Sequence, residues 1–122
     1  MSAQRKVVAL VEDDPSLLMG LGRLLSTQGF ETERFNSAEA FLDGAGASKA
    51  ACLVLDIHLG GMSGIELRHR LAATGSKIPV IFMTAFDDEV TQQEAVEAGC
   101  IAYLRKPFLA RLLMAALAVA IP

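Results

Sequence analysis

Residues 6–15 have the sequence KVVALVEDDP, an apolar run that ends in three consecutive acids. The run at 6–11 is rich in β-branched residues and lacks polar–apolar alternation, which is typical of a strand buried on both faces. Similar short apolar runs return at 51–55, 80–83 and 101–104. The segment Glu31–Phe35 instead alternates polar and apolar residues, so we expect it at the edge of a sheet. The sequence therefore predicts five strands.

Apolar residues recur at helical spacing between and after these strands, in segments near 17–25, 38–42, 65–71, 90–98 and 109–120. The expected helix ends carry the usual signals: Pro15 in a first turn, Ser37 as an N-cap, and Gly29, Gly75 and Gly99 just beyond C-terminal ends. Strict alternation of strand and helix predicts an α/β fold, a doubly wound five-stranded parallel sheet with helices on both faces. Right-handed crossovers favour the flavodoxin-like strand order 2-1-3-4-5.

Composition narrows the class of protein. The 122 residues are 52% hydrophobic and 20% charged, which predicts one folded domain over 1–122. The longest apolar run, 112–122, is too short for a membrane span of about 20 residues. Acids interrupt the N-terminal apolar run, which therefore lacks the apolar region of a secretory signal. We expect a cytoplasmic protein. A net charge of −3 predicts no direct nucleic-acid contact. Cys52 and Cys100 are expected to be buried, reduced thiols.

Acidic side chains follow two strands that this topology places side by side. The first strand ends in Glu12, Asp13 and Asp14, and the third ends in Asp56. Ligands of such folds bind outside the carboxyl ends of the strands, at the switch point between these two. Carboxylates that lie close together repel one another unless a cation neutralises them, and Mg²⁺ prefers oxygen ligands. The sequence therefore predicts a Mg²⁺ site at this edge.

The other two strand ends supply a hydroxyl and an ammonium group. Thr84 ends the fourth strand and Lys106 follows the fifth. An aspartate can act as a nucleophile and form an acyl phosphate, and phosphoryl transfer depends mainly on positioning and charge neutralisation. We expect Asp56 to attack in line while the metal, Thr84 and Lys106 neutralise the phosphoryl oxygens. Each residue alone has a structural explanation, but their convergence on one edge favours phosphoryl chemistry.

Five motifs together make nearly the whole chain similar to the response-regulator receiver domain of two-component signalling: VEDDP at 11–15, LVLD at 53–56, GMSG at 61–64, MTA at 83–85 and YLRKPF at 103–108. Within that family, residues 41–43 and 78–85 look most similar to FixJ-type regulators, which carry a DNA-binding output domain. The resemblance implies a signalling switch that catalyses only its own phosphorylation and dephosphorylation. Its implied phosphodonor is a histidine kinase or a phosphotransfer protein.

The resemblance also implies roles for the residues around the predicted metal. Asp56 would be the phosphoacceptor, Asp13 a direct Mg²⁺ ligand, and Glu12 a ligand acting through water. The backbone carbonyl of His58 would complete the metal site, and Asp14 is an additional candidate acid.

Further roles follow from the same resemblance. Thr84 and Tyr103 would form the switch pair, Lys106 would sense the phosphate, and Pro107 would follow a cis peptide bond. The family commonly has proline where this chain has Gly60, so we expect a looser loop after Asp56.

In the family that the chain resembles, the residues two positions past the phosphoacceptor and two past the switch threonine influence the lifetime of the acyl phosphate, so the resemblance implies this role for two residues here. These are His58 and Phe86. Phe86 offers an attacking water no hydrogen bond, so we expect it to shield the phosphate and slow hydrolysis. His58 would act in the opposite direction if it oriented the water.

The face formed by segments 90–98, 101–104 and 109–120 is the expected partner surface, for a homodimer or an output domain. Arg111 is the only charged residue between Phe108 and Ile121, and a surface helix without a polar face indicates an interaction site. One stripe of the last helix is expected to cover the sheet: Leu109, Leu112, Leu113, Ala116, Leu117 and Ala120. Met114, Ala118 and Ile121 would then remain for a partner.

Other classes of protein share parts of this pattern. A flavodoxin-like FMN-binding module has the same topology, but three acids after the first strand would repel its phosphate. A Mg²⁺-dependent phosphatase of the haloacid-dehalogenase type has its nucleophile after the first strand in a DxD pattern, where this chain has Glu-Asp-Asp. A receiver used only for docking would not need the intact set of Asp56, Thr84 and Lys106.

Overall fold

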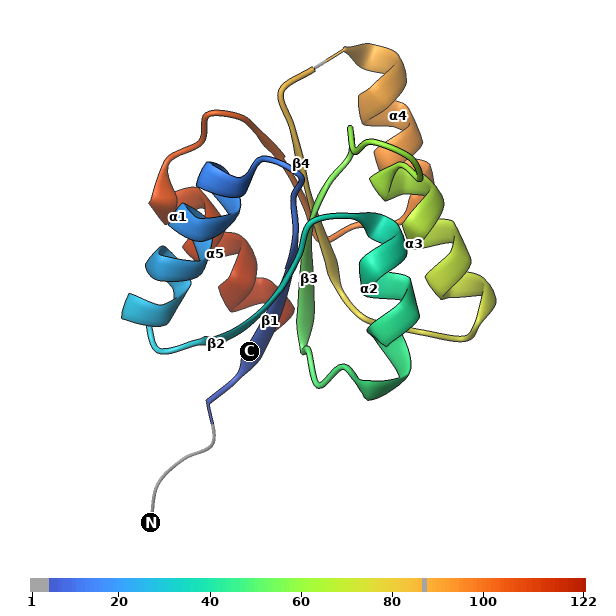
Figure 1. Cartoon of the computed structure of the whole chain (residues 1–122). Coiled ribbons are helices and arrows are strands. Elements are labelled where there is room, and N and C mark those ends of the chain that lie inside the picture. The colour runs from blue at the N-terminus through green and yellow to red at the C-terminus, as the bar shows by residue number, and fades with distance from the viewer. Residues whose placement is uncertain (1–4, 87) are drawn as a thin grey trace.

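The computed structural model describes residues 5–86 and 88–122. A parallel five-stranded sheet with the order β2-β1-β3-β4-β5 runs through the centre of the molecule, as predicted (Figure 1). The strands are β1 Val7–Val11, β2 Glu31–Phe35, β3 Cys52–Asp56, β4 Val80–Thr84 and β5 Ala102–Arg105. Strand β2, whose residues are all exposed or half-buried, lies at one edge of the sheet, also as predicted.

Helices cover both faces of the sheet. They are α1 Pro15–Thr27, α2 Ala38–Gly44, α3 Gly64–Ala73, α4 Glu89–Ala98 and α5 Ala110–Ala120, with a short 3₁₀ helix, η1 Ala45–Ala47, after α2. Helices α1 and α5 lie on one face, and α2, α3 and α4 lie on the other (Figure 1). Among the described residues, none of the helices combines the length and apolar character that a membrane crossing requires.

The apolar strands fill two cores, one on each face. Val8 and Leu10 of β1 belong to the core beneath α1 and α5, whereas Ala9 and Val11 belong to the core beneath α2, α3 and α4. All four side chains are fully buried. Because consecutive residues of a strand point to opposite faces, a strand covered on both sides needs an uninterrupted apolar run.

Helix ends follow the expected signals. The Ser37 hydroxyl accepts a hydrogen bond from the Ala40 amide and begins α2. Gly29, Gly75 and Gly99 follow the ends of α1, α3 and α4 with φ of 93°, 85° and 89°. Glycine adopts this left-handed conformation without the steric cost that a Cβ brings. Because neighbouring strands are all parallel, their carboxyl ends lie at one edge of the sheet.

Strand boundaries differ slightly from the prediction. Strand β3 is 52–56 and β5 is 102–105, each one residue later than expected, so Ile101 lies outside the sheet and is 43% exposed. Asp56 and Thr84 are the last residues of their strands. In the sheet, Asp56 pairs with Met83 and Thr84 pairs with Arg105.

The covered side of α5 was predicted correctly only in part. Leu113, Ala116 and Leu117 are buried as expected, but Leu109 and Leu112 are 57% and 47% exposed. Met114 and Ile121, expected to face a partner, pack instead against the core beneath α1 and α5. A helix that is apolar around most of its circumference lacks the polar side that would define its rotation.

Two smaller predictions also need correction. Thr91 and Ala95 form the buried positions of α4, whereas Val90 is 66% exposed. The apolar residue Val90 begins the expected helical segment 90–98, yet Thr91 rather than Val90 is one helical turn from Ala95. Both cysteines are free thiols, but only Cys52 is buried, since Cys100 is half-buried after the end of α4.

Candidate metal and phosphoacceptor site

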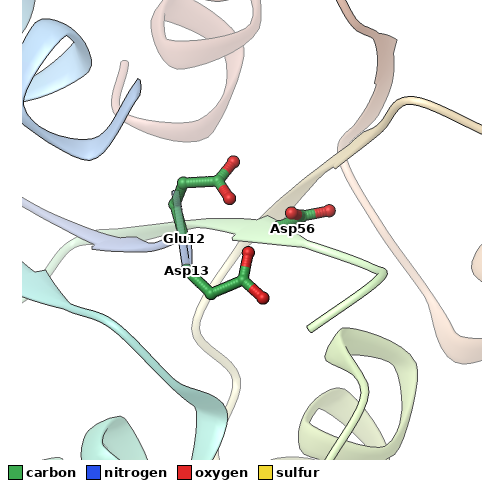
Figure 2. Close-up of side chains that lie close together, drawn as sticks. All are labelled: Glu12, Asp13 and Asp56. Carbon is green, nitrogen blue, oxygen red and sulfur yellow. The ribbon is translucent and has the colours of Figure 1, made fainter. Parts of the chain in front are cut away.

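Three carboxylates meet where β1 and β3 end. Glu12 and Asp13 follow β1, and Asp56 ends β3, whose Leu55 pairs with Val11 of β1. Figure 2 shows the three side chains reaching into one space, and an oxygen of each lies within 4.8 Å of the others. Glu12 and Asp56 are buried, and Asp13 is exposed. The predicted convergence of acids from two strands is therefore present.

A single ammonium group joins this cluster. Lys106 Nζ donates hydrogen bonds to Glu12 Oε1 at 2.5 Å and to Asp56 Oδ2 at 3.0 Å. The Lys106 amide also donates to the Thr84 carbonyl at 2.7 Å, which holds the start of the β5–α5 loop against the end of β4. The peptide bond to Pro107 is cis, as the resemblance implied.

The charges of the cluster are not balanced by Lys106 alone. Burial raises the pKa of Glu12 to about 7, against the hydrogen bonds from Lys106 and the Asp14 amide. Burial lowers the pKa of Lys106, but its hydrogen bonds to Glu12 and Asp56 reverse this effect and leave the pKa raised. Lys106 therefore stays cationic, but its single positive charge faces three carboxyl groups, those of Glu12, Asp13 and Asp56. An additional cation with a preference for oxygen ligands fits this donor set.

Asp14 lies at the start of α1 and not in the cluster of the other acids. Its carboxylate accepts hydrogen bonds from the Ser16 amide at 3.0 Å and the Leu17 amide at 3.4 Å, which makes it the N-cap of α1. Its own amide donates to Glu12 Oε2 at 3.1 Å. The three-carboxylate cluster therefore does not include Asp14, the additional acid considered from the sequence.

Thr84 is fully buried, and its hydroxyl is bound to the loop that follows β4. Oγ1 accepts a hydrogen bond from the Phe86 amide at 3.0 Å and donates one to the Phe86 carbonyl at 3.1 Å. Tyr103, the other member of the expected switch pair, lies on the adjacent strand β5 opposite Phe82. Its side chain is half-buried and packs against the core beneath α2, α3 and α4.

His58 and Phe86 contact each other, a relationship that the sequence did not indicate. Their ring centroids are 4.9 Å apart with an interplanar angle of 79°, an edge-to-face arrangement. His58 also donates its amide hydrogen to Asp56 Oδ1 at 3.1 Å. The two residues expected to tune phosphate lifetime therefore form one aromatic pair between the loops that follow β3 and β4.

The loop between β3 and α3 is held by polar contacts despite its two adjacent glycines. The Gly60 amide donates to Asp13 Oδ2 at 3.2 Å, a contact that proline at this position could not make. The Met62 amide donates to Glu39 Oε2 at 3.0 Å. The sequence did not indicate this bond, because no local pattern connects α2 to this loop.

Four features together define the receiver class of signalling modules. They are the sheet order, the acid pair after β1, the aspartate that ends β3 and the lysine after β5. A family model for the response regulator receiver domain matches residues 8–118, and the chain belongs to this family. Its members are phosphorylation-dependent signalling modules rather than classical enzymes.

Relatives and solved structures agree with this assignment. The chain is 36% identical over 108 residues to the response regulator protein TmoT of Ectopseudomonas mendocina, covering 88% of this chain and 49% of TmoT. It is 35% identical over 101 residues to the transcriptional regulatory protein FixJ of Bradyrhizobium diazoefficiens, covering 83% of this chain and 49% of FixJ. The chain spans about half the length of the curated relatives it matches.

Two solved structures extend the comparison to the fold. The structure of FixJ-N superimposes with a TM-score of 0.88 at 32% identity, covering 97% of this chain and 94% of that one. The response regulator StyR superimposes with a TM-score of 0.84 at 39% identity, covering 96% of this chain and 59% of that one.

Proposed function

We propose that this receiver accepts a phosphoryl group on Asp56, with Mg²⁺ bound beside it, from a histidine kinase or a phosphotransfer protein. The environment of Asp56 supports the proposal most directly. An oxygen of its carboxylate lies within 4.8 Å of oxygens of Glu12 and Asp13, and Lys106 donates a hydrogen bond to the Asp56 carboxylate. Phosphorylation would change the face formed by α4, β5 and α5 and so control a partner or an output domain. We place this activity in the cytoplasm, without direct nucleic-acid or membrane binding by this domain.

The residues of the cluster have distinct roles in this proposal. Asp13 would hold Mg²⁺ directly, Glu12 through water, and the His58 backbone carbonyl would supply another oxygen ligand. Bound there, Mg²⁺ supplies positive charge to the transferring phosphoryl group. The His58 amide and the Lys106 ammonium each hold one Asp56 oxygen and orient the carboxylate.

The transfer itself needs no further reactant. An oxygen of the Asp56 carboxylate would attack phosphorus as the bond to the donor's imidazole nitrogen breaks, and the imidazole leaves with the electron pair of that bond. Lys106 already contacts Asp56 Oδ2, so its ammonium is close to the position that the new phosphoryl oxygens would occupy. Its positive charge would stabilise them.

The contacts of Thr84 suggest how phosphorylation would be transmitted. Its hydroxyl donates to the Phe86 carbonyl and accepts from the Phe86 amide, so it must give up the donated bond before it can donate to a phosphoryl oxygen. The loop after β4 would then move, Tyr103 would turn inward, and the surface of α4, β5 and α5 would change. The phosphoryl group would shift an existing equilibrium between two states of this face.

The family assignment favours this function over the alternatives that the sequence left open. Three carboxylates at the ends of β1 and β3 would repel the phosphate of a bound FMN. In a haloacid-dehalogenase-type phosphatase the nucleophile follows the first strand, whereas here the aspartate contacted by Lys106 ends the third. A receiver used only for docking would not need Asp56, Thr84 and Lys106 together.

Labelling with a small phosphodonor tests the proposal most directly. The protein is incubated with the donor with and without Mg²⁺, and the modified residue is located by mass mapping under conditions that preserve acyl phosphates. We expect Mg²⁺-dependent addition of one phosphoryl group at Asp56. Labelling at another residue, or labelling indifferent to Mg²⁺, would contradict the proposal.

A further inference from the structure

The loop between β3 and α3 is held through alternate backbone amides. The His58 amide donates to Asp56 Oδ1, the Gly60 amide to Asp13 Oδ2, the Met62 amide to Glu39 Oε2, and the Gly64 amide to the Ile57 carbonyl. The first and last of these bonds are local to the loop and its flanking residues. Asp13 and Glu39 are the two acceptors from other parts of the chain, so they anchor the loop to the rest of the protein.

These two anchors respond differently to a cation. Asp13 belongs to the three-carboxylate cluster, so a metal bound there would share the carboxylate that now accepts the Gly60 amide. Polarisation by the cation weakens that carboxylate as a hydrogen-bond acceptor. Glu39 lies in the first turn of α2, outside the cluster, so a metal bound there would not share the carboxylate that accepts the Met62 amide. Glu39 is therefore the anchor that remains when the metal site is filled.

The Glu39 carboxylate fits closely against the loop. Gly61 has φ of 79°, and a Cβ atom added to it would lie 2.5 Å from Glu39 Oε2. The hydrogen bond from the Met62 amide lowers the pKa of Glu39, and its position in the first turn of α2 also favours the ionised form. Glu39 is thus a charged acceptor at neutral pH, and hydrogen bonds to charged acceptors are the stronger kind.

We propose that Glu39 is a positioning residue for the metal site, holding the β3–α3 loop and with it the His58 backbone carbonyl while Asp13 is bound to Mg²⁺. The inference rests on the proposed function, because it assigns Glu39 to the same metal site. The need for such an anchor follows from Gly60 and Gly61, whose backbones have more conformational freedom than other residues. Glu39 contributes the restraint that a stiffer sequence would supply by itself.

Three variants separate this role from a general effect of charge. Glu39→Ala removes the acceptor, Glu39→Gln keeps an acceptor oxygen of nearly the same shape, and Asp43→Ala removes one negative charge from the same helix at an exposed position. Isothermal titration with Mg²⁺ gives the Kd of each protein. Amide hydrogen exchange of Gly61 and Met62 without metal measures the loop directly and needs no phosphorylation.

We expect Glu39→Ala to raise both the Mg²⁺ Kd and the exchange rate of the Met62 amide by about threefold to tenfold, the effect of one hydrogen bond. In Glu39→Gln the increases in Kd and in exchange rate should be smaller than in Glu39→Ala. Asp43→Ala should have the Kd and the exchange rate of the wild type. In labelling assays the Mg²⁺ concentration for half-maximal rate should rise in Glu39→Ala, while the rate at saturating Mg²⁺ stays unchanged.

The outcomes distinguish this inference from the function on which it rests. If the wild type binds Mg²⁺ and is labelled on Asp56, but Glu39→Ala has the Mg²⁺ Kd of Asp43→Ala, the positioning role is wrong and the proposed function stands. Faster Met62 exchange without a change in Kd also overturns the positioning role, because Glu39 would then hold the loop without affecting the metal. If the wild type itself neither binds Mg²⁺ nor is labelled, both proposals fail.

Discussion

Lys106 and Glu12 are 94 residues apart in the chain, yet the lysine ammonium and the glutamate carboxylate form a hydrogen bond of 2.5 Å. The Glu12 side chain is 1% exposed and that of Lys106 18%, so water screens this ion pair weakly. Removing one partner of such a pair leaves the other charge buried without compensation, which costs more than the pair itself contributes. Lys106 thus stabilises the fold as well as holding an oxygen of Asp56.

Replacing Lys106 by methionine should therefore lower the free energy of unfolding. We expect a loss of about 2 kcal/mol, because Glu12 can take up a proton and so escape part of the cost of an unpaired buried charge. Urea unfolding without Mg²⁺ measures the change, with Lys77→Met, at an exposed position, as the control. Equal stability of the two variants would mean that the pair is not important for folding.

Asp56→Asn should abolish labelling by a small phosphodonor and leave the fold intact. The two side chains are nearly isosteric, and the amide oxygen can still accept a hydrogen bond from Lys106 or His58. Intact mass after labelling and the circular dichroism spectrum of the variant check both statements. Undiminished labelling in Asp56→Asn would show that another residue receives the phosphoryl group.

Mg²⁺ should raise the melting temperature of the protein, since it would bind the native cluster of Glu12, Asp13 and Asp56 and relieve their repulsion. At a metal concentration of a hundred times Kd the stabilisation should reach about 2.7 kcal/mol. The rise should disappear in Asp13→Ala and persist in Asp43→Ala. A wild-type melting temperature that does not depend on Mg²⁺ would count against the metal site.

Phe86→Glu should shorten the lifetime of the acyl phosphate. Phe86 packs its ring against His58 and offers an attacking water no hydrogen bond, whereas a carboxylate at this position could orient that water. Loss of label after removal of the donor measures the rate, and Phe86→Leu separates loss of the ring from gain of the carboxylate. Phosphate loss no faster in Phe86→Glu than in the wild type would refute the shielding role.

A phosphoryl mimic should change the surface of α4, β5 and α5. The exposed apolar residues there include Val96 on α4, and Leu109, Leu112 and Val119 at and along α5, so this face is the candidate for a homodimer. Light scattering with and without beryllofluoride measures the mass, and Leu112→Glu should block any dimer. If the mimic saturates Asp56 while the mass stays monomeric and amide exchange on α5 is unchanged, this face is not the output.

The order of strands and helices, the topology of the sheet and the acids at its carboxyl edge could all be predicted from the sequence. This was possible because a strand covered on both faces requires an uninterrupted apolar run, and because parallel strands bring their carboxyl ends to one edge. Glu12, Asp13 and Asp56 could therefore be placed together although the last two are 43 positions apart in the chain.

The contacts between loops and the rotation of the last helix became evident only in the folded protein. The bond from the Met62 amide to Glu39 and the contact of His58 with Phe86 join segments whose own patterns carry no sign of each other. Helix α5 has apolar residues around most of its circumference, so hydrophobic periodicity does not define its buried side. Packing against α1 and the sheet selects Leu113 and Leu117 for the core and leaves Leu112 at the surface, because shape rather than polarity distinguishes these leucines.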